Sequence, residues 1–165
     1  MLRPLTTDDL PELTAIYRDA VLSQASALYS PAQLRAWAGH AEQGADLAAV
    51  LRRGSGLASC GAGGSIEAFA VLEPADRLAL LYCRGRSSRH GHGRRLVLAL
   101  EEQARRQGCM RLRTEASQLS RPLLERLGWQ VEAEETVLFA GEWFRRWRMI
   151  RSLAPSPEPG SAAGP

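Results

Sequence analysis

Lysine is absent from this 165-residue sequence, so all 21 of its basic residues are arginines. A lysine Schiff base and a lysine general base are therefore excluded. Cysteine is scarce: Cys60, Cys83 and Cys109 are widely spaced, and any disulfide would leave one of the three unpaired. We expect all three to be small, buried, reduced side chains in a cytoplasmic protein.

Long apolar runs are also missing, since no stretch approaches the roughly 20 residues that span a bilayer. No signal peptide precedes the first polar helix, which favours a cytoplasmic protein without a membrane partner. The apolar and charged fractions, 45% and 24%, are those of an ordinary globular domain. A formal charge of +3 suits an anionic ligand without requiring nucleic acid.

Hydrophobic periodicity and turn residues divide the chain into short elements. We expect helices over 6–21, 31–37, 45–53, 92–107 and 120–128, with strands at 1–5, 57–60, 66–73, 78–83, 110–116, 129–140 and 143–150. Glu101 and Arg105 are expected to pair on the outer face of the helix over 92–107. The chain ends in Pro, Gly, Ser and Ala without an apolar anchor, which predicts one domain over 1–152 and a disordered tail over 153–165.

The stretch 82–93 carries the strongest functional signal. It reads Tyr-Cys-Arg-Gly-Arg-Ser-Ser-Arg-His-Gly-His-Gly and joins a predicted strand to a predicted helix. This order directs free backbone N–H groups and the positive end of a helix dipole at one point. Five arginines lie in the same region: Arg84, Arg86, Arg89, Arg94 and Arg95. The pattern predicts an anion site shaped for phosphates.

Two motifs resemble the GNAT superfamily of acyl-CoA-dependent N-acetyltransferases. The stretch 88–93 is similar to its pyrophosphate signature, Gln/Arg-x-x-Gly-x-Gly/Ala, with Ser88 in place of the first residue. Both glycines match, and we expect a side chain there to hold the backbone away from the phosphates. The stretch 120–129 resembles the segment aromatic-Tyr-Glu-x-x-Gly-Phe. The stretches 29–37, 114–117 and 141–144 look like one bacterial, mostly uncharacterised subgroup.

The resemblance implies an α/β (α+β) fold. We expect a mixed, mostly antiparallel sheet of about seven strands with flanking helices, in which 78–83 and 110–116 form a central, parallel, splayed pair. It also implies acetyl-CoA as cosubstrate, without a metal. The residues that it places around the coenzyme are Tyr82, Cys83, Arg84, Ser88, Arg89, His90, Gly91, His92, Gly93 and Arg94.

For the chemistry, the resemblance implies a backbone N–H at the end of the strand, near Tyr82 or Cys83, that holds the thioester carbonyl, with Tyr82 the expected donor. The tyrosine that commonly protonates the leaving thiolate falls on Leu124, and a frequent acidic position falls on Ala79. Glu115 is the best remaining carboxylate to act as a base. Cys83 and Tyr29 are weak acids that offer a substitute for the missing tyrosine.

Tyr29 and Trp37 lie in the early helices, which in this family wall the acceptor pocket, so they are the expected substrate-lining residues. The expected function is acetyl transfer to an amine of a small molecule or protein by a monomer or homodimer. Two alternatives stay open: an acyl-CoA-binding sensor or partner module without turnover, and an arginine-rich nucleic-acid-binding protein. His90 and His92 flank Gly91, but a metal pair is disfavoured because no third ligand accompanies them.

Overall fold

The computed structural model describes residues 1–43 and 45–154. Most of the predicted disordered tail, from Pro155 on, lies outside the described residues. Leu153, the first residue of the predicted tail, is 3% exposed and packs in the hydrophobic core. Its amide donates to the Met110 carbonyl oxygen at 2.9 Å. No helix in these described ranges is long and apolar enough to cross a membrane.

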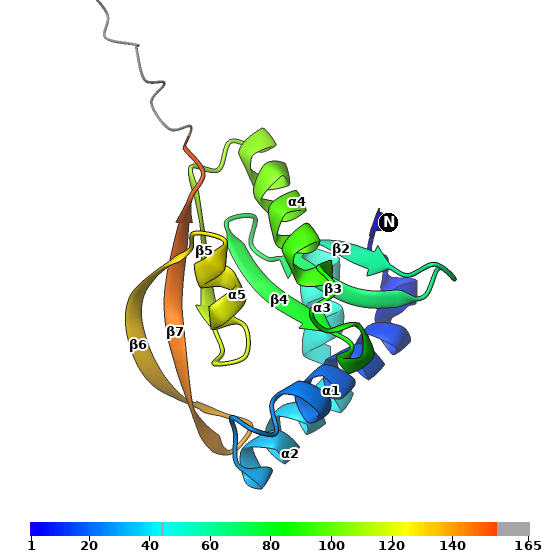
Figure 1. The fold of residues 1–165 in the computed structure, drawn as a ribbon, viewed down its shortest axis with the longest axis vertical. Coiled ribbons are helices and arrows are strands. Elements are labelled where there is room, and N and C mark those ends of the chain that lie inside the picture. Colours follow the sequence, from blue (N-terminus) through cyan, green and yellow to red (C-terminus); the bar gives the residue numbers. More distant parts are fainter. Residues whose placement is uncertain (44, 155–165) are drawn as a thin grey trace, which may run out of the picture.

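A seven-stranded mixed sheet forms the centre of the molecule (Figure 1). Its strands are β1 (Leu2–Pro4), β2 (Ser55–Cys60), β3 (Ile66–Leu72), β4 (Arg77–Cys83), β5 (Arg111–Ala116), β6 (Gln130–Phe139) and β7 (Glu142–Ser152). They lie in the order β1-β2-β3-β4-β5-β7-β6, and every neighbouring pair is antiparallel except β4–β5. The predicted fold, with one central parallel pair, is confirmed.

Helices cover both faces of this sheet. The helices are α1 (Leu10–Gln24), α2 (Pro31–His40), α3 (Ala45–Arg53), α4 (His92–Arg106) and α5 (Arg121–Arg126), with short 3-10 turns η1 (Thr7–Asp9), η2 (Ala41–Gln43) and η3 (Gly85–Ser87). Side chains of α4 and α5 pack in one core cluster, and those of α1 and α3 pack in a second cluster on the other face. The two sets of helices therefore divide the molecule into two sides.

Local signals explain where α2 begins and how it reaches the far end of the sheet. Ser30 and Gln33 form a reciprocal capping box, and Pro31 occupies the first helical position. The Gln33 side chain also donates from Nε2 to the Trp143 carbonyl oxygen at 2.8 Å. This bond joins the start of α2 to the β6–β7 hairpin.

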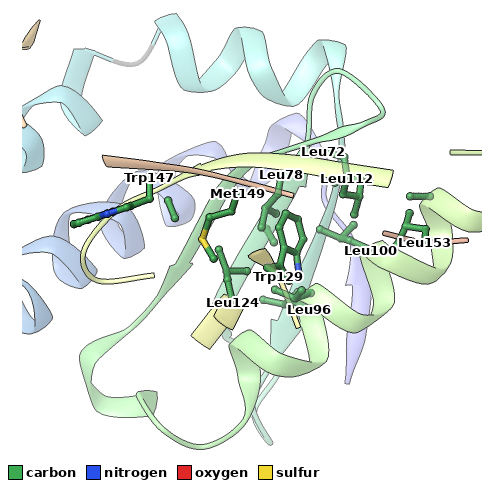
Figure 2. Packing of buried hydrophobic residues seen from close by; sticks show 14 of the residues in the cluster. Leu72, Leu78, Leu96, Leu100, Leu112, Leu124, Trp129, Trp147, Met149 and Leu153 are labelled. Carbon is green, nitrogen blue, oxygen red and sulfur yellow. The ribbon is translucent and has the colours of Figure 1, made fainter. Parts of the chain in front are cut away.

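The larger core cluster lies between the sheet and the helices α4 and α5 (Figure 2). Leu96 and Leu100 of α4 lie near Leu124 of α5 and Met149 of β7, and all four side chains are at most 1% exposed. Burial of this many apolar groups fixes α4 and α5 on the sheet. The two helix starts that border the functional site are thereby held in place.

Glu101 is buried in this core, contrary to the predicted outer-face pair with Arg105. Its carboxylate accepts a hydrogen bond from Trp129 Nε1 at 3.0 Å, and Arg151 Nε lies 3.3 Å from the same oxygen. A buried charge is costly unless it is paired. The pair therefore links α4 to β7 and to the turn before β6, and its removal leaves the Arg151 charge without a partner.

We predict that Glu101→Ala lowers the free energy of unfolding by about 2–4 kcal/mol, because it removes the acceptor of the buried Trp129 N–H and the ion-pair partner of the half-buried Arg151. Glu102→Ala, one residue along the same helix at an exposed position, is the matched control and should change it by less than about 0.5 kcal/mol. Urea unfolding followed by tryptophan fluorescence measures both. Equal effects of the two substitutions would contradict a structural role for the buried carboxylate.

Candidate functional site

A cavity opens where β4 and β5 separate. The two strands pair only at Arg77–Arg113 and Leu78–Thr114, and Thr114 Oγ1 donates to the Leu78 carbonyl oxygen at 2.7 Å. Beyond this vertex the strands diverge around a cavity of about 1340 Å³. Its walls come from the loop before α4 and from α5 on one side, and from α1, α2, β6 and β7 on the other. The cavity thus connects the two sides of the sheet.

The first wall is the loop between β4 and α4, which presents backbone donors. Arg89 and Gly91 adopt positive φ angles of 65° and 84°. Among the described residues, the amides of Arg89, Gly91, His92, Gly93 and Arg94 donate to no backbone or side-chain acceptor. Several free N–H groups at a helix start form an anion site. The structure therefore has the phosphate-type geometry that the sequence predicts.

The structure gives a further reason for each glycine of this loop. A Cβ at Gly91 would meet no atom within 4 Å, and glycine is favoured there by its φ of 84°. A Cβ at Gly93 would lie 2.9 Å from Leu123 Cδ2. The second glycine therefore allows the start of α4 to approach α5 closely.

Glu67 of β3 anchors the loop between β4 and α4 through hydrogen bonds. Its carboxylate accepts hydrogen bonds from Arg86 at 2.6 and 3.0 Å, from Ser87 Oγ at 2.5 Å and from Ser65 Oγ at 2.8 Å. These bonds, first of all the one from Arg86, lower the pKa of Glu67 from 4.5 to about 2. A second contact runs from the Gly85 amide to Asp19 Oδ2 at 2.8 Å. The loop is thus anchored to both β3 and α1.

The arginines and histidines of the loop divide into two groups. Arg89 and Arg94 line the cavity with Ser88, whereas Arg84 and His90 do not. Arg84 instead donates from Nε to the Ile66 carbonyl oxygen at 2.8 Å and lies 3.5 Å from Glu12. The Arg84 side chain is therefore bonded to β3 and α1, and coenzyme binding by Arg84 stays a prediction.

His92 fastens α4 to β2 with its side chain. Its Nδ1 lies 2.7 Å from Ser59 Oγ, a fully buried hydroxyl, and 3.1 Å from the Arg95 guanidinium. Burial, and then the charge of Arg95, lower the pKa of His92. The residue lines the cavity at the first position of α4, where its backbone N–H is free. Over residues 1–43 and 45–154, no three His, Cys, Asp or Glu side chains gather as metal ligands.

The register of β3 and β4 shows which of the two predicted amides, Tyr82 or Cys83, faces the cavity. The Arg84 amide donates to the Glu67 carbonyl oxygen at 2.8 Å, and Tyr82 lies opposite Phe69. Because hydrogen-bonded positions recur every second residue, the Tyr82 amide points at β3. The amides of Leu81 and Cys83 point to the other edge, where the strands separate. These two are the donors available to a carbonyl group in the cavity.

The second wall is aromatic. Tyr29 and Trp37 line the cavity as predicted, together with Tyr17, Tyr82, Phe139 and Phe144. Trp37 Nε1 donates to the Tyr82 hydroxyl at 3.2 Å, and the rings of Tyr17 and Tyr82 stack at 4.3 Å. Sequence reasoning missed Tyr17, Phe139 and Phe144. Their spacing is that of ordinary core residues, so periodicity alone gives no signal for them.

Groups that could handle protons are few at the vertex of the cavity. Glu115 lines it and accepts a hydrogen bond from Arg77 Nε at 2.9 Å. Leu124 is 1% exposed and packs in the core, and Ala79 also lines the cavity. Glu115 is therefore a carboxylate within the cavity, with Arg77 bonded to one of its oxygens.

Two parallel strands that separate, followed by a helix whose first amides are free, agree with what the family comparison finds. Residues 26–129 match the model of the acetyltransferase (GNAT) family. The chain belongs to the GNAT acetyltransferase family. No curated protein matches this chain.

Solved structures share the fold over nearly their full length. A GCN5-related N-acetyltransferase from Rhodopseudomonas palustris is 28% identical, with 92% of this chain and 94% of that chain covered and a TM-score of 0.88. PaiA N-acetyltransferase from Thermoplasma acidophilum, in complex with coenzyme A, is 18% identical over 92% and 98% of the chains, with a TM-score of 0.75. A phosphinothricin acetyltransferase from Sinorhizobium meliloti, in complex with acetyl-CoA, is 19% identical over 97% and 94%, with a TM-score of 0.68.

We predict that the stabilising effect of Glu67 depends on pH. Its pKa is lowered on folding from 4.5 to about 2, so the contribution of the carboxylate is present above pH 4.5 and is lost as the pH falls toward 2. The difference in unfolding free energy between the wild type and Glu67→Gln should therefore shrink over that interval. Urea unfolding at several pH values measures this difference.

The control for this prediction is Glu42→Gln, which removes an exposed carboxylate paired with Arg18. Exposed pairs contribute little, so this variant should follow the wild type at each pH. A difference between the wild type and Glu67→Gln that stays constant down to pH 2 would show that Glu67 acts through packing alone.

Proposed function

We propose that this GNAT protein is an N-acetyltransferase that moves the acetyl group of acetyl-CoA to an amine of a small molecule or protein. The carrying observation is that the free amides at the start of α4 and the open edge of β4 line one continuous cavity. A diphosphate needs the first feature and a thioester carbonyl needs the second. Two of the solved relatives are complexes with coenzyme A or acetyl-CoA, which supports the same assignment.

The residues at the loop fit such a ligand. The amides of Gly91, Gly93 and Arg94 supply hydrogen-bond donors, and the guanidinium groups of Arg89 and Arg94 supply positive charge at the cavity wall. Ser88 lines the same wall, and Cys83 contributes its backbone at the strand end. This protein would therefore hold the phosphates mainly with main-chain groups, which explains why Ser88 is tolerated at its motif position.

Acetyl transfer needs two further features: a donor to the thioester carbonyl oxygen and a surface that holds the acceptor amine. The amide of Cys83 or Leu81 would donate to the thioester carbonyl oxygen as negative charge develops there during attack by the amine. The aromatic wall built by Tyr17, Trp37 and Phe144 would hold the acceptor on the opposite side of the sheet. Bringing both reactants to the vertex of the splay supplies much of the rate through proximity.

The function is tested by titrating the protein with coenzyme A and by measuring free thiol released from acetyl-CoA with a panel of amines. We expect coenzyme binding, and thiol release that depends on the amine. Gly91→Ala should weaken coenzyme binding roughly tenfold, because alanine resists the positive φ that directs the loop amides. Gly108→Ala, with the same φ of 84° and open surroundings at the other end of α4, should leave binding unchanged.

Equal losses of binding in the two glycine variants would contradict the assignment of the loop. A protein that binds coenzyme A but releases no thiol with any amine would support the sensor alternative, which Leu124 and Ala79 favour. Nucleic-acid binding is disfavoured because thirteen of the arginines in residues 1–43 and 45–154 lie within 4.0 Å of a carboxylate. A salt-dependent gel shift would reverse that conclusion.

Glu115 is the proposed base for the acceptor amine. We predict that Glu115→Gln lowers kcat roughly a hundredfold while the affinity for coenzyme A stays unchanged, because the amide cannot accept the proton. Glu134→Gln breaks a comparable ion pair, with Arg145, and should leave kcat unchanged. Steady-state kinetics and calorimetric titration measure the two quantities. Turnover of Glu115→Gln within twofold of the wild type would restrict Glu115 to holding Arg77.

A further inference from the structure

The leaving thiolate of the proposed reaction has no proton donor on α5. The side chain at the position of the family's tyrosine is Leu124, which packs among Leu96, Trp129 and Met149 (Figure 2). Substituting a polar group there would disturb the core. A side-chain donor for the sulfur would therefore come from another element that lines the same cavity.

Tyr29 reaches that region from the opposite wall. It precedes α2, and its ring is held edge-on by Trp37 at 5.2 Å and tilted against Phe144 at 5.9 Å between ring centroids. Its hydroxyl oxygen accepts a hydrogen bond from the Gln118 amide at 2.9 Å. Gln118 lies between the end of β5 and the start of α5, so the Tyr29 hydroxyl lies at the segment that leads into the usual tyrosine position.

The hydroxyl of Tyr29 is in a suitable state to donate. Its oxygen accepts the bond from the Gln118 amide, a contact that leaves the hydroxyl hydrogen to donate. The residue lines the cavity between the splayed strands. Burial raises the pKa of Tyr29, which keeps the hydroxyl protonated in the absence of a negatively charged partner.

The other weak acids of the cavity are less suitable. The Cys83 thiol donates to the Arg84 carbonyl oxygen at 3.4 Å, so its hydrogen already has an acceptor within the chain. The Tyr82 hydroxyl accepts from Trp37 Nε1 and its ring stacks on Tyr17, on the acceptor side of β4. Of these groups, only Tyr29 is bonded to the segment that joins β5 to α5.

We propose that Tyr29 is the proton donor to the coenzyme sulfur, an inference that rests on the proposed acetyl transfer. The amine nitrogen forms a bond to the thioester carbonyl carbon, the carbon–sulfur bond breaks, and its electron pair stays on sulfur. The sulfur then takes the hydroxyl proton of Tyr29 and leaves as coenzyme A thiol. The proton lost by the amine returns to the tyrosinate through solvent, so that the amide product and the thiol balance the reactants.

The first test compares binding of coenzyme A with that of desulfo-coenzyme A, which lacks only the sulfur. A hydrogen bond from Tyr29 should make the wild type prefer coenzyme A roughly tenfold above the pKa of the thiol, and Tyr29→Phe should remove this preference. Ser120→Ala is the control, because it removes a side-chain bond to the Ser117 amide at 3.0 Å and loosens the same loop without removing the phenol. It should change both affinities equally.

The second test uses an amine that supports thiol release by the wild type. Tyr29→Phe should lower kcat roughly a hundredfold with little change in KM for acetyl-CoA. A preference for coenzyme A that persists in Tyr29→Phe, or a kcat equal to that of the wild type, would overturn the role of Tyr29. Absence of amine-dependent thiol release in the wild type would instead overturn the proposed function, and the binding comparison would still decide whether Tyr29 contacts the sulfur.

Discussion

The site depends on the loss of pairing between two neighbouring strands in the middle of a sheet. β4 and β5 share hydrogen-bonded register at two positions and then separate. Backbone donors along the freed edges would be costly if they were buried without partners. A ligand that accepts their hydrogen bonds is therefore favoured at this place, and the cavity becomes a binding site because of how the sheet is built.

Side chains and backbone amides of β4 point in different directions. Alternation along the strand turns the Tyr82 ring toward the aromatic wall, while the neighbouring amides of Leu81 and Cys83 face the splay. One short strand thus presents an aromatic ring to one side of the cavity and free amides to the edge where the strands separate, as the proposed acetyl transfer needs. The Arg77–Glu115 ion pair lies at the vertex where the two strands begin to separate.

Much of the fold was predictable because its signals are local. Alternating residues mark β5, the Ser30–Pro31 pair marks the start of α2, and a glycine-rich loop marks the start of α4. The directions of individual side chains were not predictable from such signals. Glu101, Arg84 and His92 each point at a partner from a distant strand or turn, and no spacing within their own segment specifies that partner. The aromatic wall was not predictable for the same reason, since Phe139 and Phe144 come together with Tyr17 only in the folded chain.

The hydrogen bond from Gln33 to the Trp143 carbonyl oxygen has a consequence for how such a protein can diversify. It joins two segments from opposite ends of the domain, the start of α2 and the β6–β7 hairpin, neither of which contributes to the loop before α4. Changes in the length or sequence of the β6–β7 hairpin can therefore change the aromatic side of the cavity, while the loop before α4 keeps its geometry. Under the proposed function, the segments beside the acceptor and the segments that hold the coenzyme are therefore separate parts of one small fold.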